Sequence, residues 1–101
     1  ISSRTLSYMP PHAFLINTSR GDVVDERALL AALDEKGIAG AALDVFESEP
    51  MIRPELLHHA NVVLLPHLGS ATMESRVAMG QRAIANIDAF VAGRNLPDRI
   101  A

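Results

Sequence analysis

Short apolar runs alternate with amphipathic stretches along this chain of 101 residues. Residues 13–17 (AFLIN) are almost wholly apolar, which is typical of a parallel strand buried on both faces. Residues 38–46 (IAGAALDVF) and 61–65 (NVVLL) are the next two strand candidates. With the helices described below, this order predicts an α/β fold, part of a doubly wound parallel sheet.

Two helices are predicted between and after these strands. The first follows Asp25, a typical N-cap residue, and covers residues 26–36, with Gly37 expected to end it in the left-handed conformation. The second covers about residues 72–93, and a single helical turn is expected around residues 54–57 (PELL). The longer helix carries an apolar stripe that predicts core or interface packing. The stripe consists of Met73, Val77, Gly80, Ile84, Ile87 and Val91.

Polar side chains follow each predicted strand. Residues 18–20 (TSR) come after the first strand, Asp44 and Glu49 after the second, and His67 after the third. In open parallel sheets the ligand crevice lies beyond the carboxyl ends of the strands. The pattern therefore predicts that an arginine, carboxylates and a histidine meet at one edge of the sheet.

These residue types suit the reduction of a carbonyl group. A histidine transfers protons near neutral pH, a carboxylate orients its ring, and an arginine binds a substrate carboxylate with two parallel hydrogen bonds. The hydride would have to come from a cofactor. From the residues alone, His67 could instead be structural, Arg20 could pair with Asp22, and Glu47 competes with Glu49 for the histidine.

Composition narrows the function classes. The net charge is −3, and the nine Lys and Arg residues are scattered among few aromatics, which argues against a nucleic-acid surface. With no cysteine, neither disulfides nor a thiolate metal site is expected, and we expect a cytoplasmic protein. We expect no membrane span or signal peptide. The adjacent His58 and His59 lack a spaced third ligand, so no metal site is predicted.

The first residues indicate a piece of a longer protein. The chain opens with ISSRTLSYMPP, without an initiator Met, and Pro10–Pro11 would stop a helix coming from further upstream. We therefore expect additional sequence before this opening.

Three motifs resemble the D-isomer-specific 2-hydroxyacid dehydrogenases. They are FLINTSRGDVVDERALLAAL (14–33), GAALDVFESEP (40–50) and NVVLLPHLGSAT (61–72). The last of them, with the ES that follows, is most similar to the glyoxylate and hydroxypyruvate reductase branch. The resemblance implies that residues 1–101 are the C-terminal portion of a Rossmann-type NAD(P)-binding domain. Residues 72–93 would then return toward an absent substrate domain.

The resemblance also implies roles for individual residues. Arg20 matches the residue that binds the substrate carboxylate and carbonyl oxygen. His67 matches the general acid, and Glu49 the carboxylate that hydrogen-bonds it. Asp44 matches the residue that holds the nicotinamide carboxamide. The implied neighbours of an NAD or NADP cofactor are Thr18, Ser19, Arg20, Asp44, His67, Gly69 and Ser70.

By the same resemblance, we expect a homodimeric oxidoreductase that interconverts a 2-oxo acid, glyoxylate or hydroxypyruvate, and its 2-hydroxy acid. The sequence contains neither a G-x-G-x-x-G fingerprint nor the residue that selects NAD or NADP, so these residues alone are expected to be inactive.

Two other functions stay open. An NAD(H)-sensing binding protein of the co-repressor type would carry an aromatic-bearing segment where this chain has LGSATMES. A truncated structural module is the third possibility. One residue departs from the family pattern, since His12 stands where relatives commonly have glycine; a positive φ there would cost about 1–2 kcal/mol.

Overall fold

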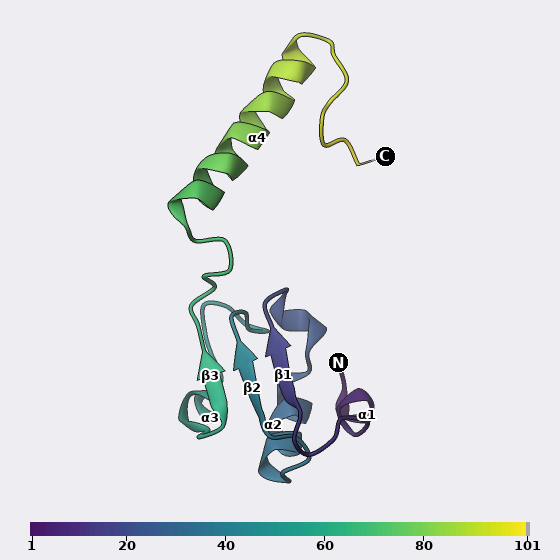
Figure 1. Ribbon diagram of the computed structural model, residues 1–101, viewed down its shortest axis with the longest axis vertical. Coiled ribbons are helices and arrows are strands. Elements are labelled where there is room, and N and C mark those ends of the chain that lie inside the picture. The colour runs from purple at the N-terminus through teal and green to yellow at the C-terminus, as the bar shows by residue number, and fades with distance from the viewer. Residues whose placement is uncertain (101) are drawn as a thin grey trace. The chain divides into compact units, whose positions relative to one another are not determined.

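Three parallel strands form the sheet (Figure 1). The computed structural model describes residues 1–100. β1 (Phe14–Asn17) pairs with β2 (Gly40–Leu43), which pairs with β3 (Val62–Leu64). In this register Asn17 lies opposite Leu43, and Leu43 lies opposite Leu64, so the three strands end together. The sheet confirms the predicted α/β class and brings the polar residues after each strand to one edge.

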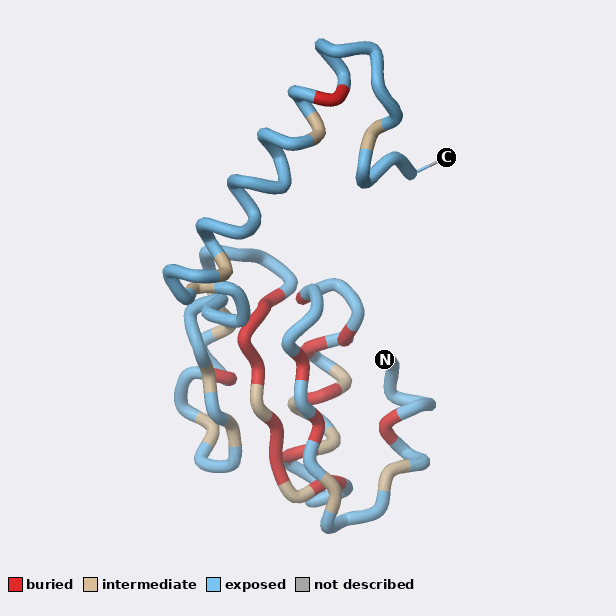
Figure 2. Tube along the Cα trace, turned by 45° about the horizontal axis from the view of Figure 1, so that its top comes forward, coloured by how far each residue is buried: buried red, intermediate tan, exposed pale blue. Residues whose placement is uncertain are grey.

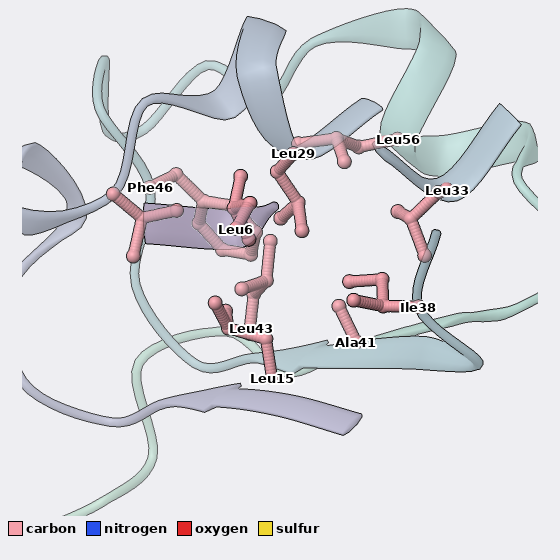
Figure 3. Packing of buried hydrophobic residues seen from close by; sticks show 10 residues of the cluster. Leu6, Leu15, Leu29, Leu33, Ile38, Ala41, Leu43, Phe46 and Leu56 are labelled. Carbon is pink, nitrogen blue, oxygen red and sulfur yellow. The ribbon is translucent and has the colours of Figure 1, made fainter. Parts of the chain in front are cut away.

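The core lies between one face of the sheet and the short helices. These are α1 (Ser3–Leu6), α2 (Glu26–Asp34) and α3 (Pro54–His58). Figure 3 shows leucines from all three helices packed against side chains of β1 and β2. The buried cluster consists of Leu6, Leu15, Val24, Leu29, Leu33, Ile38, Ala41, Leu43, Phe46 and Leu56.

The prediction that residues 13–17 are buried on both faces is wrong for the described chain. Leu15 and Asn17 are buried, whereas Phe14 and Ile16 are 67% and 71% exposed. The reason is that successive side chains of a strand point to opposite faces, and the helical leucines pack against only one of them. Burial therefore alternates along β1, as the tube in Figure 2 shows.

The predicted start of α2 is confirmed, but its predicted end is wrong in detail. The Asp25 side chain accepts a hydrogen bond from the Ala28 backbone N–H at 3.0 Å. At the other end the left-handed residue is Lys36, with φ 55°, and not Gly37. The Gly37 N–H donates to the Ala32 carbonyl at 2.8 Å, and α2 ends at Asp34, two residues earlier than predicted.

The strain considered for His12 does not arise. Among the non-glycine residues that the structure describes, only Lys36 and His67 have positive φ. His12 lies in a turn closed by a 2.9 Å hydrogen bond from the Ala13 N–H to the Pro10 carbonyl.

The residues from Ser70 on form a second compact unit, separate from Ile1–Gly69. Its helix α4 (Met73–Val91) begins at Thr72, whose side chain accepts from the Ser75 N–H at 3.2 Å. Most of its side chains are exposed, and Ala89 is the buried exception. The large apolar side chains of the predicted stripe are all among the exposed ones. No described helix has the length and apolar character needed to cross a membrane.

Candidate active site

A turn stabilised by Asn17 places Arg20 at the end of β1. The buried Asn17 side chain donates to the Arg20 carbonyl at 2.9 Å and accepts from the Ser19 N–H at 3.1 Å. Gly21 then passes so close to the next chain segment that an added Cβ would lie 2.0 Å from the Phe46 carbonyl carbon and oxygen. Only glycine permits this approach, which fixes Arg20 beside the segment after β2.

Glu49 and His67 form a direct hydrogen-bonded pair. His67 Nδ1 lies 2.9 Å from Glu49 Oε2, and Glu49 Oε1 accepts from the Phe46 N–H at 3.0 Å. An ionised carboxylate only accepts hydrogen bonds, so Nδ1 carries the hydrogen in this pair. Nε2 is then the ring nitrogen available for proton transfer.

The same contacts lower the pKa of the Glu49 carboxyl group below its ordinary value. The hydrogen bond from His67 contributes most, followed by the Phe46 N–H, with smaller effects from the charges of His67 and Arg20. Partial desolvation acts in the opposite direction. Glu49 is therefore ionised at neutral pH.

Asp44 holds the backbone segment that follows His67. Its buried carboxylate accepts from the Leu68 N–H and the Gly69 N–H, each at 2.7 Å. His67 itself has φ 55°, a left-handed conformation that non-glycine residues adopt at a cost. Two carboxylates thus fix His67, Asp44 through the backbone that follows it and Glu49 through the imidazole ring.

Arg20, Glu49 and His67 line one open cavity of about 360 Å³. Glu49 and His67 also border a neighbouring cavity of about 200 Å³ whose other walls are apolar, among them Phe46 and Ile52. A cationic group, a carboxylate and a proton-transferring imidazole therefore face a space in which a small acid can be bound beside an apolar wall.

The structure resolves the choice between the two glutamates. Glu49, as the motif predicted, contacts His67, whereas Glu47 binds Arg53 at 3.1 Å. Thr18 and Ser19 are exposed beside Arg20, and Ser70 is the first residue of the second unit. The catalytic and cofactor-binding roles of all these residues stay predictions.

Of the two adjacent histidines, His59 contacts residues outside the candidate site. His59 Nε2 lies 3.6 Å from Asp34 Oδ1, and His59 Nδ1 accepts from the Asn61 N–H. Within residues 1–100, no group of three or more His, Cys, Asp or Glu side chains is arranged to hold a metal ion.

Sequence reasoning missed three polar residues that shape the site. Asn17 ends an otherwise apolar run, and a polar residue at a strand end is a recognised turn signal. The contacts of Glu26 with the segment that carries Glu49 join positions 21 and 27 residues apart in the chain. No local pattern in the sequence indicates such a pairing.

Acidification tests the lowered pKa of Glu49. A carboxyl group whose folded-state pKa is lowered stabilises the fold above its unfolded-state pKa, and this contribution is lost as the pH falls through the folded-state value. At pH values below about 4.5, we expect the urea concentration at the unfolding midpoint to fall by more in the wild type than in Glu49→Gln. Glu35→Gln, at an exposed carboxylate after α2, is the matched control and should follow the wild type. Identical pH profiles for wild type and Glu49→Gln would contradict the assignment.

Comparison with known proteins identifies the family of this fold and site. Residues 1–69 match the sequence model described as "D-isomer specific 2-hydroxyacid dehydrogenase, NAD binding domain". The matched residues coincide with the first compact unit. The chain belongs to the D-isomer specific 2-hydroxyacid dehydrogenase family.

Several similar relatives are named glyoxylate or hydroxypyruvate reductases. The chain is 51% identical over 100 residues to the glyoxylate reductase of Thermococcus litoralis, covering 99% of this chain and 30% of that enzyme. It is 53% identical over 95 residues to glyoxylate/hydroxypyruvate reductase B of Enterobacter agglomerans, covering 93% of this chain and 29% of the relative. The chain thus spans about 30% of the length of these curated relatives.

A solved structure is similar to the whole of this chain. The NADPH-dependent glyoxylate/hydroxypyruvate reductase of Sinorhizobium meliloti, in complex with NADP and malonate, matches with a TM-score of 0.95 and 42% identity. The match covers 100% of this chain and 32% of that one. It confirms the Rossmann-type α/β fold predicted from the sequence.

Proposed function

We propose that this chain supplies the proton-transfer site of an oxidoreductase that interconverts a 2-oxo acid and a D-2-hydroxy acid with NAD(H) or NADP(H). Glyoxylate and hydroxypyruvate are the proposed substrates, because similar relatives are named for them. The observation that carries the proposal is the 2.9 Å contact between His67 and Glu49 at a cavity that Arg20 also lines.

His67 is the proposed general acid. Glu49 accepts from Nδ1 and holds the ring, so that the protonated Nε2 faces the substrate carbonyl oxygen. Transfer of this proton to the oxygen, as a hydride reaches the carbonyl carbon, gives the hydroxy acid. In the reverse direction the neutral Nε2 removes the proton from the hydroxyl group. Such positioned proton transfer contributes roughly 10²–10⁴-fold to a rate.

The C-terminal edge of the sheet fits the nicotinamide end of the cofactor. Each Asp44 oxygen accepts one backbone N–H, and a carboxylate oxygen has a second lone pair for a donor such as a carboxamide N–H. Thr18 and Ser19, just after β1, add exposed hydroxyl groups. When bound, NADH or NADPH supplies the hydride. Residues that hold the pyrophosphate would lie outside this sequence, which has no G-x-G-x-x-G.

Several properties of the whole enzyme belong to the same proposal. The remaining parts of the cofactor site and the substrate domain would come from the part of a longer protein that this chain does not include, since the relatives are about three times as long. We also propose a homodimer, as the family resemblance implies, and a cytoplasmic location, as the composition led us to expect. Light scattering of the longer protein would measure twice the monomer mass if it is a dimer.

Arg20 tests the substrate half of the proposal. In a hybrid enzyme, this chain replaces the matched segment of the Thermococcus litoralis glyoxylate reductase. Arg20→Gln in that hybrid should lower kcat/KM for glyoxylate by about 10²-fold, because a charged partner for the substrate carboxylate is lost. The Kd for the reduced cofactor that the hybrid uses, NADH or NADPH, should stay nearly unchanged when measured by fluorescence.

Arg27→Gln, at an exposed arginine on α2, is the matched control for this substitution and should keep the activity of the hybrid. An Arg20→Gln hybrid with unchanged kcat/KM would show that Arg20 does not bind the substrate.

A further inference from the structure

A buried carboxylate outside the proposed catalytic set binds the loop that carries Glu49. Glu26 is the first residue of α2, and only 4% of its side chain is exposed. Its Oε1 accepts from the Glu47 N–H at 2.9 Å, and its Oε2 accepts from Arg53 Nε at 3.0 Å. One side chain therefore fixes the chain at two positions, two residues before Glu49 and four residues after it.

Glu47 and Arg53 complete a closed ring of contacts. Glu47 Oε1 accepts from the Glu26 N–H at 3.1 Å, one of the α2 N–H groups that have no partner within the helix. Arg53 Nη2 donates to Glu47 Oε2 at 3.1 Å. The guanidinium thus bridges both carboxylates, and residues 47–53 are anchored to the start of α2 at both ends.

The charges of this ring make it sensitive to the loss of Arg53. Two carboxylates share one guanidinium, and the hydrogen bond to Glu47, with the charges of Glu47 and Glu26, raises the pKa of Arg53. A carboxylate as buried as Glu26 needs a charged or hydrogen-bonding partner, and removing one leaves its charge uncompensated. Without Arg53, the two glutamates would repel each other at the base of the loop.

Glu49 depends on this anchoring for its own geometry. Its two oxygens contact groups on separate elements, the Phe46 N–H just after β2 and the His67 ring after β3. Both contacts require the loop to bring Glu49 back toward the sheet edge. The ring of Glu26, Glu47 and Arg53 supplies the polar side-chain contacts that join this loop to α2 in the described chain.

We propose that Glu26 and Arg53 are positioning residues for proton transfer, which hold the 47–53 loop so that Glu49 stays paired with His67. The proposal rests on the proposed function for its catalytic meaning, but its structural content does not. Neither residue lines the cavity shared by Arg20, Glu49 and His67. They act through Glu49 and not on the substrate.

The test is a titration of the Glu49 carboxyl carbon by NMR in the full 101-residue chain. Arg53→Gln should raise the pKa of Glu49 toward its ordinary value, because the contacts with His67 and the Phe46 N–H that lower it are weakened. Arg53→Lys keeps the charge but lacks the fork that bridges two carboxylates, and it should raise that pKa as well. Arg82→Gln removes an exposed pair with Asp98 in the second unit and should leave it unchanged.

Two results would overturn the proposal. One is a Glu49 pKa that equals the wild-type value in both Arg53 variants. The other is an effect of Arg53→Gln that Arg53→Lys fully restores, which would show that charge and not bridging matters. Retained methyl resonances of Leu29 in Arg53→Lys establish that the core is folded, so a folding failure is recognised directly.

A kinetic measurement separates this proposal from the function. In the hybrid enzyme, Arg53→Lys should lower kcat by about 10-fold or more with little change in KM, as expected when a reacting group is misplaced. If the hybrid is inactive but the titrations respond as described, the positioning proposal stands and the reductase function fails. If the hybrid is active but the pKa of Glu49 does not change in the Arg53 variants, the reductase function stands and the positioning proposal fails.

Discussion

His67→Gln is expected to lower kcat/KM for glyoxylate reduction by the hybrid enzyme by about 10²–10⁴-fold, the contribution of a general acid. Glutamine has nearly the reach of histidine but cannot release a proton to the carbonyl oxygen. Its amide can still donate a hydrogen bond to Glu49, so the loop and the cavity should keep their shape. The expected signature is a large loss of turnover with the Kd for the reduced cofactor, NADH or NADPH, retained.

His58→Gln is the matched control for this experiment. His58 is exposed at the end of α3, and the same substitution there changes no group of the proposed site. The His58 variant should keep the activity of the hybrid. Equal activities for the two variants would show that His67 is not the proton donor, whatever its contact with Glu49.

Gly21→Ala should be the most destabilising glycine-to-alanine substitution in the first unit. A Cβ at this position would lie 2.0 Å from the Phe46 carbonyl carbon and oxygen and 2.5 Å from the Glu47 nitrogen. These are backbone atoms, so no side-chain rotation relieves the contact. Overpacking of this kind costs about 1–3 kcal/mol, and more where the backbone must move. Urea unfolding followed through amide resonances of β1 and β2 measures the change.

Gly80→Ala provides the matched control. Gly80 lies within α4, and an added Cβ there meets nothing within 4 Å. Alanine favours helix over glycine by about 0.5–1 kcal/mol, so the helix should be strengthened and the unfolding of the first unit should not change. If Gly21→Ala unfolds at the wild-type urea concentration, the close approach of Gly21 to Phe46 is not present in solution.

Much of the fold was predictable because each element has a local cause. The Asp25 cap, the three- and four-residue spacing in α2 and the apolar strands specify the elements, and parallel pairing sets the edge where they end. The exposure of Phe14 and Ile16 was not predictable in this way, since it depends on what covers the second face of the sheet. The left-handed Lys36 was missed because Gly37 beside it is the usual choice.

The candidate site shows the same division. Arg20, Glu49 and His67 were placed together by strand order and by the family motifs, and their geometry agrees with that prediction. Their roles stay predictions. What the sequence did not indicate is how these side chains are held. The contacts of Glu26 with Glu47 and Arg53 join distant positions that no periodicity links. No local pattern indicates the left-handed backbone of His67 either.

Consumption of NADH and of NADPH by the hybrid enzyme, with glyoxylate and then hydroxypyruvate, tests the central claim most directly. A 2-oxo acid reductase should oxidise one cofactor or both with these acids, and the loss of absorbance should require the substrate. Binding of the cofactor without turnover on either acid, in a folded hybrid, would contradict the claim and favour a binding protein on the same fold.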